Sequence, residues 1–347
     1  MGEFLAGKNV LVTGGTGSIG SEIVRQVLRR GCNVVRVFSR DETKQFYLQH
    51  ELRAHENVRY LIGDVRDRER VLRAMDGIDV VFHAAALKHV PLSEYNPFEA
   101  TETNVRGTQN VLSAAVDRNA DRVVVISTDK AVSPMNVVGA TKLLAERLAT
   151  AANYLRGDHR TRMASVRFGN VIGSRGSLVP LVLRQIREGG PVTVTDPEMT
   201  RFVISPAQAV QLVFTAAERM EGGEVFVLKM RIARILDVVE VLIEEYGPRY
   251  GYDPSSIAVE MVGRRPGEKL SEVLMTEEEA ALAKETDDMY IIRQDMDIVH
   301  LREPASRGRA PEYSSGQGRL LTKEEIRRLV REVAPVTDAG PVVPGSL

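Results

Sequence analysis

Short hydrophobic runs rich in β-branched residues alternate with longer amphipathic stretches along the first half of the chain. Four such runs are NVLVTG, NVVRVFS, VRYLIGD and DVVFHAAA, and each is followed by a stretch whose apolar residues have helical spacing. Such alternation is typical of βαβ units. It predicts an α/β fold, a doubly wound parallel sheet with helices on both faces. The uninterrupted run VVVIS further predicts a strand buried on both sides.

The alternation weakens after about residue 173, where Gly, Pro and charged residues become more frequent. We interpret residues 1–172 as one domain, to which 205–230 return through GGEVFVLK. Residues 173–204 and 231–300 are expected to form a smaller substrate-binding lobe over the strand ends. Residues 301–347 form a C-terminal extension with one helix-like stretch, TKEEIRRLVREV, and about the last ten residues are expected to be disordered.

Residues 13–20, TGGTGSIG, lie between the first predicted strand and the first predicted helix. Glycine allows a tight turn there and lets a pyrophosphate approach the backbone N–H groups of a helix N-terminus. The alternative is a purely structural turn, but the strand-to-helix context favours a dinucleotide-binding domain. The cofactor contacts predicted in this turn are Gly14, Thr16, Gly17, Ser18, Ile19 and Gly20.

The second strand ends in VFSRDETK, where an NAD-binding chain usually offers a carboxylate to the adenosine ribose. Ser39, Arg40 and Lys44 cluster there and suit a 2′-phosphate, so we predict NADP as the cofactor. Asp41 adjoins them and keeps NAD possible. A solvated helix N-terminus would also explain Asp41, but it would not explain the basic pair.

Further cofactor contacts are expected after the third and fourth strands. Asp64 is positioned to reach the adenine, although it would equally suit a cap of the next helix. The small side chains after the fourth strand offer a wall to the cofactor, whereas His83 on that strand is interpreted as a core histidine. The contacts predicted here are Asp64, Val65, Ala84, Ala85, Ala86 and Lys88.

The stretch STDKAVSPMNVVGATK follows the buried run and places an acid beside an amine at a strand end. Asp129 and Lys130 therefore suggest proton-transfer chemistry, with a surface ion pair as the alternative. A lysine at its usual pKa of about 10.4 is protonated at neutral pH and does not act as a base. We expect burial and the nearby Lys142 to lower the pKa of Lys130.

Five motifs, in this order and spacing, resemble the extended short-chain dehydrogenase/reductases: TGGTGSIG, AAALKHVPLSE, STDKAVSPMNVVGATK, RFGNVIGSRGS and RRPGEK. More narrowly, they resemble the UDP-N-acetylglucosamine 4,6-dehydratases of surface-polysaccharide synthesis, over about residues 7–295. The resemblance implies a Rossmann fold and a hydro-lyase that converts a UDP-N-acetylhexosamine, UDP-GlcNAc above all, to a UDP-4-keto-6-deoxy sugar. Such an enzyme oxidises C4, eliminates water across C5 and C6, and returns the hydride to C6.

The resemblance also assigns roles to the side chains of the STDKA motif. It implies that Asp129 is the acid at the C6 hydroxyl, that Lys130 is the base at C5, and that Thr128 hydrogen-bonds the C4 oxygen. Lys142 would hold the nicotinamide ribose. Most members of the wider family carry tyrosine four residues before this lysine, but Val138 stands there and has no proton to exchange. Our hypothesis is that Asp129, or a water held by Thr128 and Lys142, takes the C4 hydroxyl proton.

Substrate contacts are implied by resemblance in the second half of the chain. Asn170 is expected near the nicotinamide and the substrate phosphates, and Lys88 near the sugar. Arg201 and Arg265 would bind the UDP diphosphate because a guanidinium forks onto phosphate oxygens. Glu268 would accept from the uridine ribose hydroxyls, although RRPGEK also has the Pro-Gly signature of a charged turn.

Composition narrows the choice of partners. The 347 residues include 46 Lys and Arg against 47 Asp and Glu, so no basic excess favours nucleic acid or an anionic membrane. The single Cys32 excludes an internal disulfide framework and favours a reducing cytoplasm. We expect no membrane span, no export signal and no metal site. Fold analogy suggests a homo-oligomer.

Two other functions stay open from the sequence. A nucleotide-sugar 4-epimerase of the same architecture also oxidises C4, but it needs no acid-base pair for C5 and C6. A non-catalytic NADP-binding scaffold is the second alternative, and Val138 is its chief support.

Overall fold

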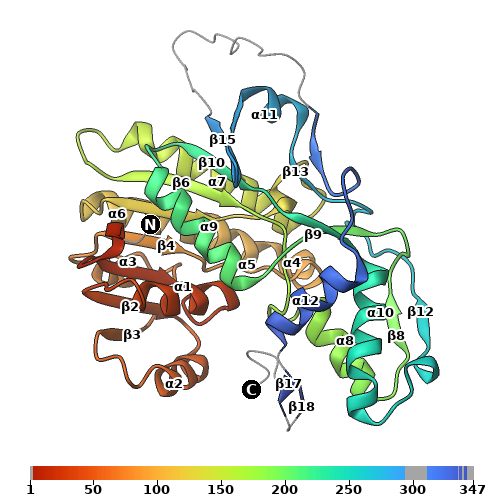
Figure 1. Cartoon of the computed structure of the whole chain (residues 1–347). Helices are drawn as coiled ribbons and strands as arrows, with labels where there is room; N and C mark the ends of the chain where they lie inside the picture. The colour runs from red at the N-terminus through yellow and green to blue at the C-terminus, as the bar shows by residue number, and fades with distance from the viewer. Residues whose placement is uncertain (1–2, 294–310, 335, 338–339, 342–347) are drawn as a thin grey trace.

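The computed structural model describes residues 3–293, 311–334, 336–337 and 340–341, and a nine-stranded sheet is its largest element (Figure 1). The strand order is β14-β15-β10-β6-β5-β4-β1-β2-β3. The strands from β10 to β3 run parallel, and β15 and β14 add an antiparallel edge. The strands are β1 (Asn9–Thr13), β2 (Val34–Ser39), β3 (Val58–Ile62), β4 (Val80–His83), β5 (Arg122–Ile126), β6 (Arg162–Arg167), β10 (Glu224–Leu228), β14 (Ala283–Glu285) and β15 (Met289–Arg293).

Helices cover both faces of this sheet because alternate strand residues point to opposite sides. Val10 and Val12 belong to a core that includes α1 and α9, whereas Leu11 between them belongs to a core that includes α3 and α6. The doubly wound α/β fold predicted from the hydrophobic pattern is therefore confirmed. The helices around the sheet are α1 (Ser18–Leu28), α2 (Glu42–Glu51), α3 (Arg68–Ala74), α6 (Gly107–Asp117), α7 (Val137–Leu155) and α9 (Pro206–Arg219).

The helical segment between β4 and β5 is interrupted. The chain forms α4 (Val90–Tyr95), α5 (Pro97–Thr101), a π-helical turn (Glu102–Arg106) and then α6. Within the turn, Asn104 Oδ1 accepts from Leu87 N (2.8 Å), and Asn104 Nδ2 donates to Leu87 O and Thr141 Oγ1 (both 3.0 Å). The wide turn thus ties the loop after β4 to α7, and such turns are frequent near functional sites.

The second half of the chain builds a smaller part beside the strand ends (Figure 1). Its core lies between α10 and its neighbours α8 and α12. A capping box at Thr322 and Glu325 begins α12, which confirms the helix expected in the C-terminal extension. Its helices are α8 (Leu178–Arg187), α10 (Ile235–Tyr246) and α12 (Lys323–Val333), whereas α11 (Glu277–Leu282) lies beside β15 at the edge of the large sheet (Figure 1).

Four small sheets complete the fold. They pair β11 (Arg231–Arg234) with β9 (Thr200–Ile204) and β7 (Asn170–Val171), β12 (Val259–Met261) with β8 (Val192–Val194), β13 (Val273–Met275) with β16 (Tyr313–Ser314), and β17 (Val336–Thr337) with β18 (Gly340–Pro341). The expectations for residues 294–310 and for most of the last ten residues lie outside the described residues. None of the helices in the described ranges has the length and apolar character that crossing a membrane requires.

Candidate active site

The motifs predicted to hold cofactor and substrate follow strands that are neighbours in the sheet. The carboxyl ends of β5, β4 and β1 lie side by side, because these parallel strands are adjacent. The glycine turn after β1, the AAALKHV loop after β4 and the STDKA turn after β5 therefore meet at one edge. Ligands of open α/β sheets bind at this carboxyl edge.

The glycine turn is built closely enough to need its glycines. Gly14 has φ +64°, and a Cβ there would lie 2.7 Å from Ala85 N. A Cβ on Gly20 would lie 2.1 Å from Gly14 O, so α1 begins directly against the turn. The helix has no side-chain cap and no acidic residue in its first turn. These features fit a cofactor pyrophosphate at the N–H groups of Ser18 and Ile19.

The predicted basic cluster at the end of β2 consists of ion pairs. Lys44 pairs with Asp41, whose Oδ1 also accepts from Lys44 N (2.9 Å) and so caps α2. Arg40 NH1 lies 3.6 Å from Asp64 Oδ2. Each cation is thus partly neutralised by a carboxylate, which weakens the sequence argument for a 2′-phosphate. Ser39 Oγ hydrogen-bonds Thr16 Oγ1 (2.8 Å) and joins the two cofactor segments.

The residues after β3 make more hydrogen bonds within the protein than the sequence indicated. Asp64 accepts from Arg66 N (3.0 Å) and from its guanidinium (2.7 Å), which helps to lower the pKa of Asp64 although burial opposes it. The alternative role of Asp64 as a helix cap is wrong, because Asp67 caps α3. Val65 is buried, and its carbonyl accepts from Asn110 Nδ2 (2.9 Å).

Arg175 is a residue at the glycine turn that sequence reasoning missed. Its backbone N–H donates to Ser18 Oγ (3.0 Å), its guanidinium donates to Thr16 O, and its carbonyl accepts from Lys88 Nζ (2.7 Å). The RFGNVIGSRGS segment therefore lies across the glycine turn. Burial, together with Arg175 and Lys130, lowers the pKa of Lys88. In the sequence, Arg175 was visible only as an arginine within a glycine-rich segment. No neighbouring residue indicated what its side chain would contact.

Asp129 and Lys130 begin a single 3-10 turn directly after β5. Asp129 is fully buried, and its Oδ1 accepts from Thr128 Oγ1 (2.7 Å) and Lys130 Nζ (3.0 Å). The alternative of a surface ion pair is therefore wrong. Asp129 Oδ2 lies beside Gly169, where a Cβ would be 3.4 Å away, and it accepts no hydrogen bond from any described residue.

The expected lowering of the pKa of Lys130 is wrong. Burial does lower it, but Asp129 and the carboxylate of Glu272, 3.5 Å from Nζ, outweigh burial and raise the pKa of Lys130 above its ordinary value. Arg201, not Lys142, is the cation that opposes them. Sequence reasoning missed Glu272, which stands 142 positions after Lys130 and had no local signal.

Lys142, like Lys88, has a pKa below the ordinary value of a lysine. It is buried on α7, and its Nζ donates to Ile126 O (2.6 Å) at the end of β5. Burial lowers the pKa of Lys142 to about 8, although Glu146 acts in the opposite direction. On the same helix, a Cβ on Gly139 would lie 2.2 Å from Lys130 O. The glycine therefore lets α7 pack directly on the Asp129 turn.

His83 is a core histidine, as predicted. Its Nδ1 shares a hydrogen bond with Thr13 Oγ1 (2.7 Å) and its Nε2 with Thr108 Oγ1 (3.0 Å). Burial, with a contribution from Lys142, lowers the pKa of His83 to about 3. The neutral ring thus links β1, β4 and α6 beneath the site.

The side chains expected to contact the substrate differ in how many of their polar atoms already have partners in the protein. Asn170 lies on β7, and its buried Oδ1 has no partner among the described residues. Arg201 is almost buried and donates to the carbonyls of Thr200, Lys269 and Leu270. Three of its five N–H donors are therefore occupied, which leaves it a poorer phosphate partner than the sequence indicated.

RRPGEK forms the charged turn that was considered as its alternative structure. Glu268 N donates to Arg265 O (3.0 Å), and Arg265 N donates back to Glu268 Oε2 (3.1 Å). The turn packs on the start of α7, where Asn136 Nδ2 donates to Gly267 O (3.2 Å). Lys269 Nζ donates to Val132 O (2.8 Å). The segment thereby covers the STDKA turn.

Three buried acceptors without donors define what the site can bind. They are Asp129 Oδ2, Asn170 Oδ1 and Glu272 Oε2, none of which has a partner within the described ranges. Buried acceptors of this kind cost stability unless a donor reaches them. Sugar hydroxyls are donors of the right kind. In the same described ranges, no group of three or more His, Cys, Asp or Glu side chains is arranged to hold a metal ion.

Residues 10–294 match the family described as polysaccharide biosynthesis protein. The chain belongs to this family. It is an extended short-chain dehydrogenase/reductase, related to UDP-N-acetylglucosamine 4,6-dehydratases and to UDP-glucose 4-epimerases. The resemblance inferred from the five motifs is therefore confirmed.

Three curated relatives indicate the range of the family. An uncharacterized membrane protein of Methanocaldococcus jannaschii is 49% identical over 332 residues, 96% of this chain and 98% of the relative. A UDP-N-acetylglucosamine 4,6-dehydratase (inverting) of Campylobacter jejuni is 41% identical over 84% of each chain. A UDP-glucose 4-epimerase of Rickettsia canadensis is 39% identical over 93% of this chain and 95% of the relative.

Solved structures of family members agree in fold. Pen from Bacillus thuringiensis is 48% identical and superposes with a TM-score of 0.88 over 95% of this chain and 98% of that chain. The dTDP-glucose 4,6-dehydratase DesIV of Streptomyces venezuelae, solved with NAD, is 27% identical with a TM-score of 0.66 over 76% and 86% of the two chains.

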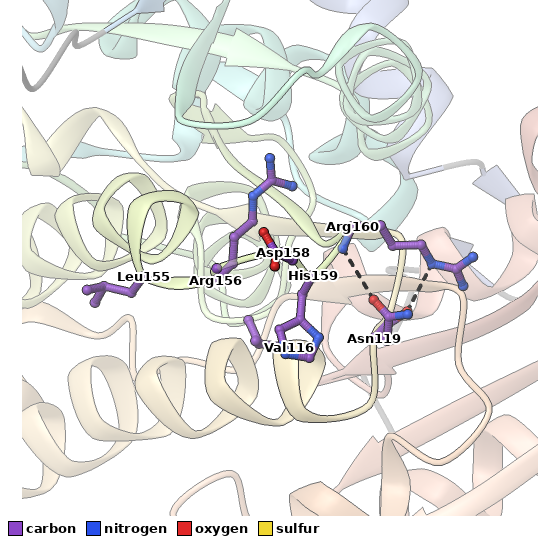
Figure 2. Close-up of a pocket in the computed structure, with 8 residues that line it drawn as sticks. Val116, Asn119, Leu155, Arg156, Asp158, His159 and Arg160 are labelled. Atoms are coloured by element: carbon purple, nitrogen blue, oxygen red, sulfur yellow. Dashed lines mark hydrogen bonds between the residues drawn. The ribbon is translucent and has the colours of Figure 1, made fainter.

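Val138 stands at the position where the resemblance to the wider family led us to expect tyrosine. The side chain is 3% exposed, so it fills the space beside the STDKA turn without offering a proton. A surface pocket of about 540 Å³ lies elsewhere, lined by residues 155–160 with Val116 and Asn119 (Figure 2). Its lining residues come from the ends of α6 and α7 and from the segments that lead from these helices into β5 and β6. It is at the amino edge of the sheet, away from the candidate site.

Proposed function

We propose that this protein is a nicotinamide-dependent nucleotide-sugar 4,6-dehydratase that acts on a UDP-N-acetylhexosamine, with UDP-GlcNAc as the expected substrate. The observation that carries the proposal is the fully buried Asp129, bonded to Thr128 and Lys130, with one oxygen left without a partner among the described residues. An epimerase has no use for an acid and an amine so arranged. The Campylobacter relative, named as a dehydratase of this type, supports the same choice.

The first proton transfer serves oxidation of the sugar at C4. The nicotinamide, when bound, accepts the hydride from C4 and later returns it to C6. The C4 hydroxyl must release a proton at the same time, and Val138 has none of the phenol chemistry used elsewhere in the family. Asp129 Oδ2 is the acceptor in our proposal, since Oδ1 is already held by two donors. Thr128 and Lys142 orient the C4 oxygen.

The second pair of transfers removes water across C5 and C6. Asp129 now carries the proton taken from C4, and it delivers that proton to the departing C6 hydroxyl. Lys130 first releases its own proton to solvent, which its 27% exposed side chain reaches, then takes the C5 proton and gives it back when the hydride arrives at C6. It regains a solvent proton once Asp129 is an anion again. One water leaves, and both side chains end in their starting states.

Substrate and cofactor are held by the residues that surround this turn. Asn170, Lys88 and the Arg265–Glu268 turn are proposed for the UDP-sugar, with Arg201 as a support for that turn because its donors go to residues 269–270. Either NADP or NAD is compatible with the ion-paired ribose end of the site. The sequence suggested a free basic cluster that favoured NADP, but the structure has one arginine–carboxylate pair and one lysine–carboxylate pair there.

A nucleotide-sugar 4-epimerase is the second candidate. The observation that favours it is the relative in Rickettsia canadensis, named UDP-glucose 4-epimerase, which matches 93% of this chain. Both candidates share the C4 oxidation and the cofactor site. They differ only after the ketone has formed.

One experiment separates these functions. The protein is incubated with UDP-GlcNAc and NADP or NAD in heavy water, and the product is examined by mass spectrometry and NMR. Loss of one water with deuterium at C5 supports the dehydratase. An unchanged sugar skeleton with inverted C4 supports the epimerase, and recovery of the unaltered substrate supports a non-catalytic scaffold.

A further inference from the structure

Glu272 is a buried carboxylate at the floor of the proposed site, and its backbone is fixed from one side. It immediately precedes β13 and is 3% exposed. Its N–H donates to Ser315 Oγ (2.8 Å), and its carbonyl accepts from Ser315 N (2.8 Å). The backbone of Glu272 is therefore held in place without any help from the charge of the side chain.

The carboxylate of Glu272 lies between two cations from different parts of the fold. Oε1 is 3.5 Å from Lys130 Nζ, after β5, and 3.9 Å from Arg201 Nε, on β9. Oε2 is buried and accepts no hydrogen bond from any residue in the described ranges. A buried anion with an unsatisfied oxygen destabilises the fold unless it interacts with a charge or a ligand. The carboxylate of Glu272 is therefore placed to interact with the amino group of Lys130.

We propose that Glu272 is a positioning residue of this site, which holds the Lys130 amino group against Asp129 and keeps it protonated until Asp129 has taken a proton from the substrate. The inference rests on the proposed function. It goes beyond it by giving the two proton transfers an order.

The order follows from the charges around the amino group. Asp129 and Glu272 are anions within 4 Å of Lys130 Nζ, whereas Arg201 and Lys88 are the cations that act against them. Proton uptake by Asp129 at C4 removes one anion of the two. An opposite charge at such a distance changes a pKa by about 1–3, so Lys130 then releases its proton more easily to solvent, which its 27% exposed side chain reaches. The base at C5 becomes available only after C4 has been oxidised.

The direct test measures the protonation of Lys130 without turnover. The ¹³Cε chemical shift of labelled lysine is followed against pH, and the Lys130 signal is assigned by its loss in Lys130→Met. Glu272→Gln is expected to lower the pKa of Lys130 by about 1 or more. Asp129→Asn, which imitates the uncharged carboxyl, is expected to lower it as well.

Glu268→Gln is the matched control. Glu268 also lies 3.9 Å from Arg201, but it is not paired with Lys130. Its replacement is expected to leave the pKa of Lys130 unchanged. Glu272→Asp keeps the charge on a shorter side chain and is expected to give a Lys130 pKa between those of wild type and Glu272→Gln. This variant replaces Glu272→Gln in the test if Glu272→Gln does not fold. An equal Lys130 pKa in wild type, Glu272→Gln and Glu272→Asp would overturn the proposal.

A second readout keeps this inference separate from the proposed function. The rate of C5 deuterium exchange is measured against pH in wild type and Glu272→Gln. If the acid limb moves to lower pH by the same amount as the Lys130 pKa, both claims are supported. If the pKa falls while wild type exchanges no C5 hydrogen, the positioning role stands and the dehydratase proposal fails.

Discussion

Lys130 and Lys142 differ in the direction in which the fold shifts their pKa values. Lys130 stands at the mouth of the core, yet two carboxylates raise its pKa. Lys142 stands on a helix, yet burial lowers its pKa to about 8. Side-chain charge at this site thus depends on burial and on partners both adjacent and distant, since Asp129 is the neighbour of Lys130 and Glu272 lies 142 positions after it. A motif alone identifies the residues and leaves their protonation open.

His83 gives a prediction for stability against pH. Its pKa of about 3 in the folded chain lies below the ordinary 6.5, so the unfolded chain binds one more proton between these values. The free energy of unfolding therefore falls as pH decreases from 6.5 toward 3. Urea denaturation is expected to show wild type losing about 3 kcal/mol relative to His83→Gln between pH 7 and pH 4. Equal pH dependence in the two proteins would contradict this, and exposed His159→Gln is the control.

Elements meet at the site through close backbone contacts. Helix α7 approaches the Asp129 turn at Gly139, and the loop after β7 approaches the glycine turn at Arg175. The π-helical turn adds Asn104 between the β4 loop and α7. These contacts fix where the STDKA turn, the glycine turn and the loop after β7 lie relative to one another.

Replacing Gly139 tests the contact between α7 and the catalytic turn. The new methyl group in Gly139→Ala would lie 2.2 Å from Lys130 O, so the helix must move away. We expect a loss of about 1–3 kcal/mol in the free energy of unfolding, measured with urea, and slower reduction of the nicotinamide. Ala140→Ser changes the next, exposed position and should alter stability by less than about 0.5 kcal/mol. Unchanged stability in Gly139→Ala would refute the contact.

Replacing Arg175 tests the link between the substrate segment and the cofactor turn. No carboxylate among the described residues lies within 4.0 Å of its guanidinium, which leaves the charge available to a cofactor phosphate near Thr16 and Ser18. Arg175→Gln is expected to raise the dissociation constant of NADP or NAD about tenfold or more in calorimetric titration. Arg184→Gln, exposed on α8, should bind as wild type does. Equal affinities for all three proteins would contradict the link.

The whole molecule is joined through one buried network beneath the site. Arg167 on β6 is 1% exposed and pairs with Glu146 on α7 (2.7 Å) and Glu279 on α11 (2.8 Å). Burial lowers the pKa of Arg167, but the two carboxylates outweigh it and raise the pKa above its ordinary value. Ser127 Oγ also donates to Glu146 Oε1 (2.5 Å). The large sheet, the Lys142 helix and the later part of the chain therefore share one set of charges.

Breaking this network should cost far more than breaking a surface ion pair. Arg167→Met leaves Glu146 buried without its cation, and we expect a loss of about 3–5 kcal/mol in the free energy of unfolding. The exposed pair Arg106–Glu102 is the control, since Arg106→Gln should cost no more than about 1 kcal/mol. Urea denaturation of both variants decides the matter. Similar losses of stability in the two variants would contradict the claim that the buried network stabilises the fold more than a surface ion pair does.

Sequence reasoning reached the fold and the motif-bearing turns because both depend on local pattern. Alternating apolar runs report strands and helices, and TGGTGSIG reports a turn within eight residues. Glu272, Arg175 and the Arg167 network were missed because each makes its contacts over more than twenty positions. The NADP argument weakened partly for the same reason, since Asp64 reaches Arg40 from the next strand. Local spacing shows which charged residues are neighbours, but it does not show which distant residues they pair with.

The central claim is that Asp129 and Lys130 move different protons of one sugar. The most direct measurement adds UDP-GlcNAc and oxidised cofactor in heavy water to wild type, Asp129→Asn and Lys130→Met. Absorbance of the reduced nicotinamide and deuterium at C5 are both recorded. We predict that Asp129→Asn loses cofactor reduction by about 10²–10⁴-fold, whereas Lys130→Met reduces the cofactor but incorporates no deuterium at C5. Deuterium at C5 at the wild-type rate in Lys130→Met, or undiminished cofactor reduction in Asp129→Asn, would contradict the account.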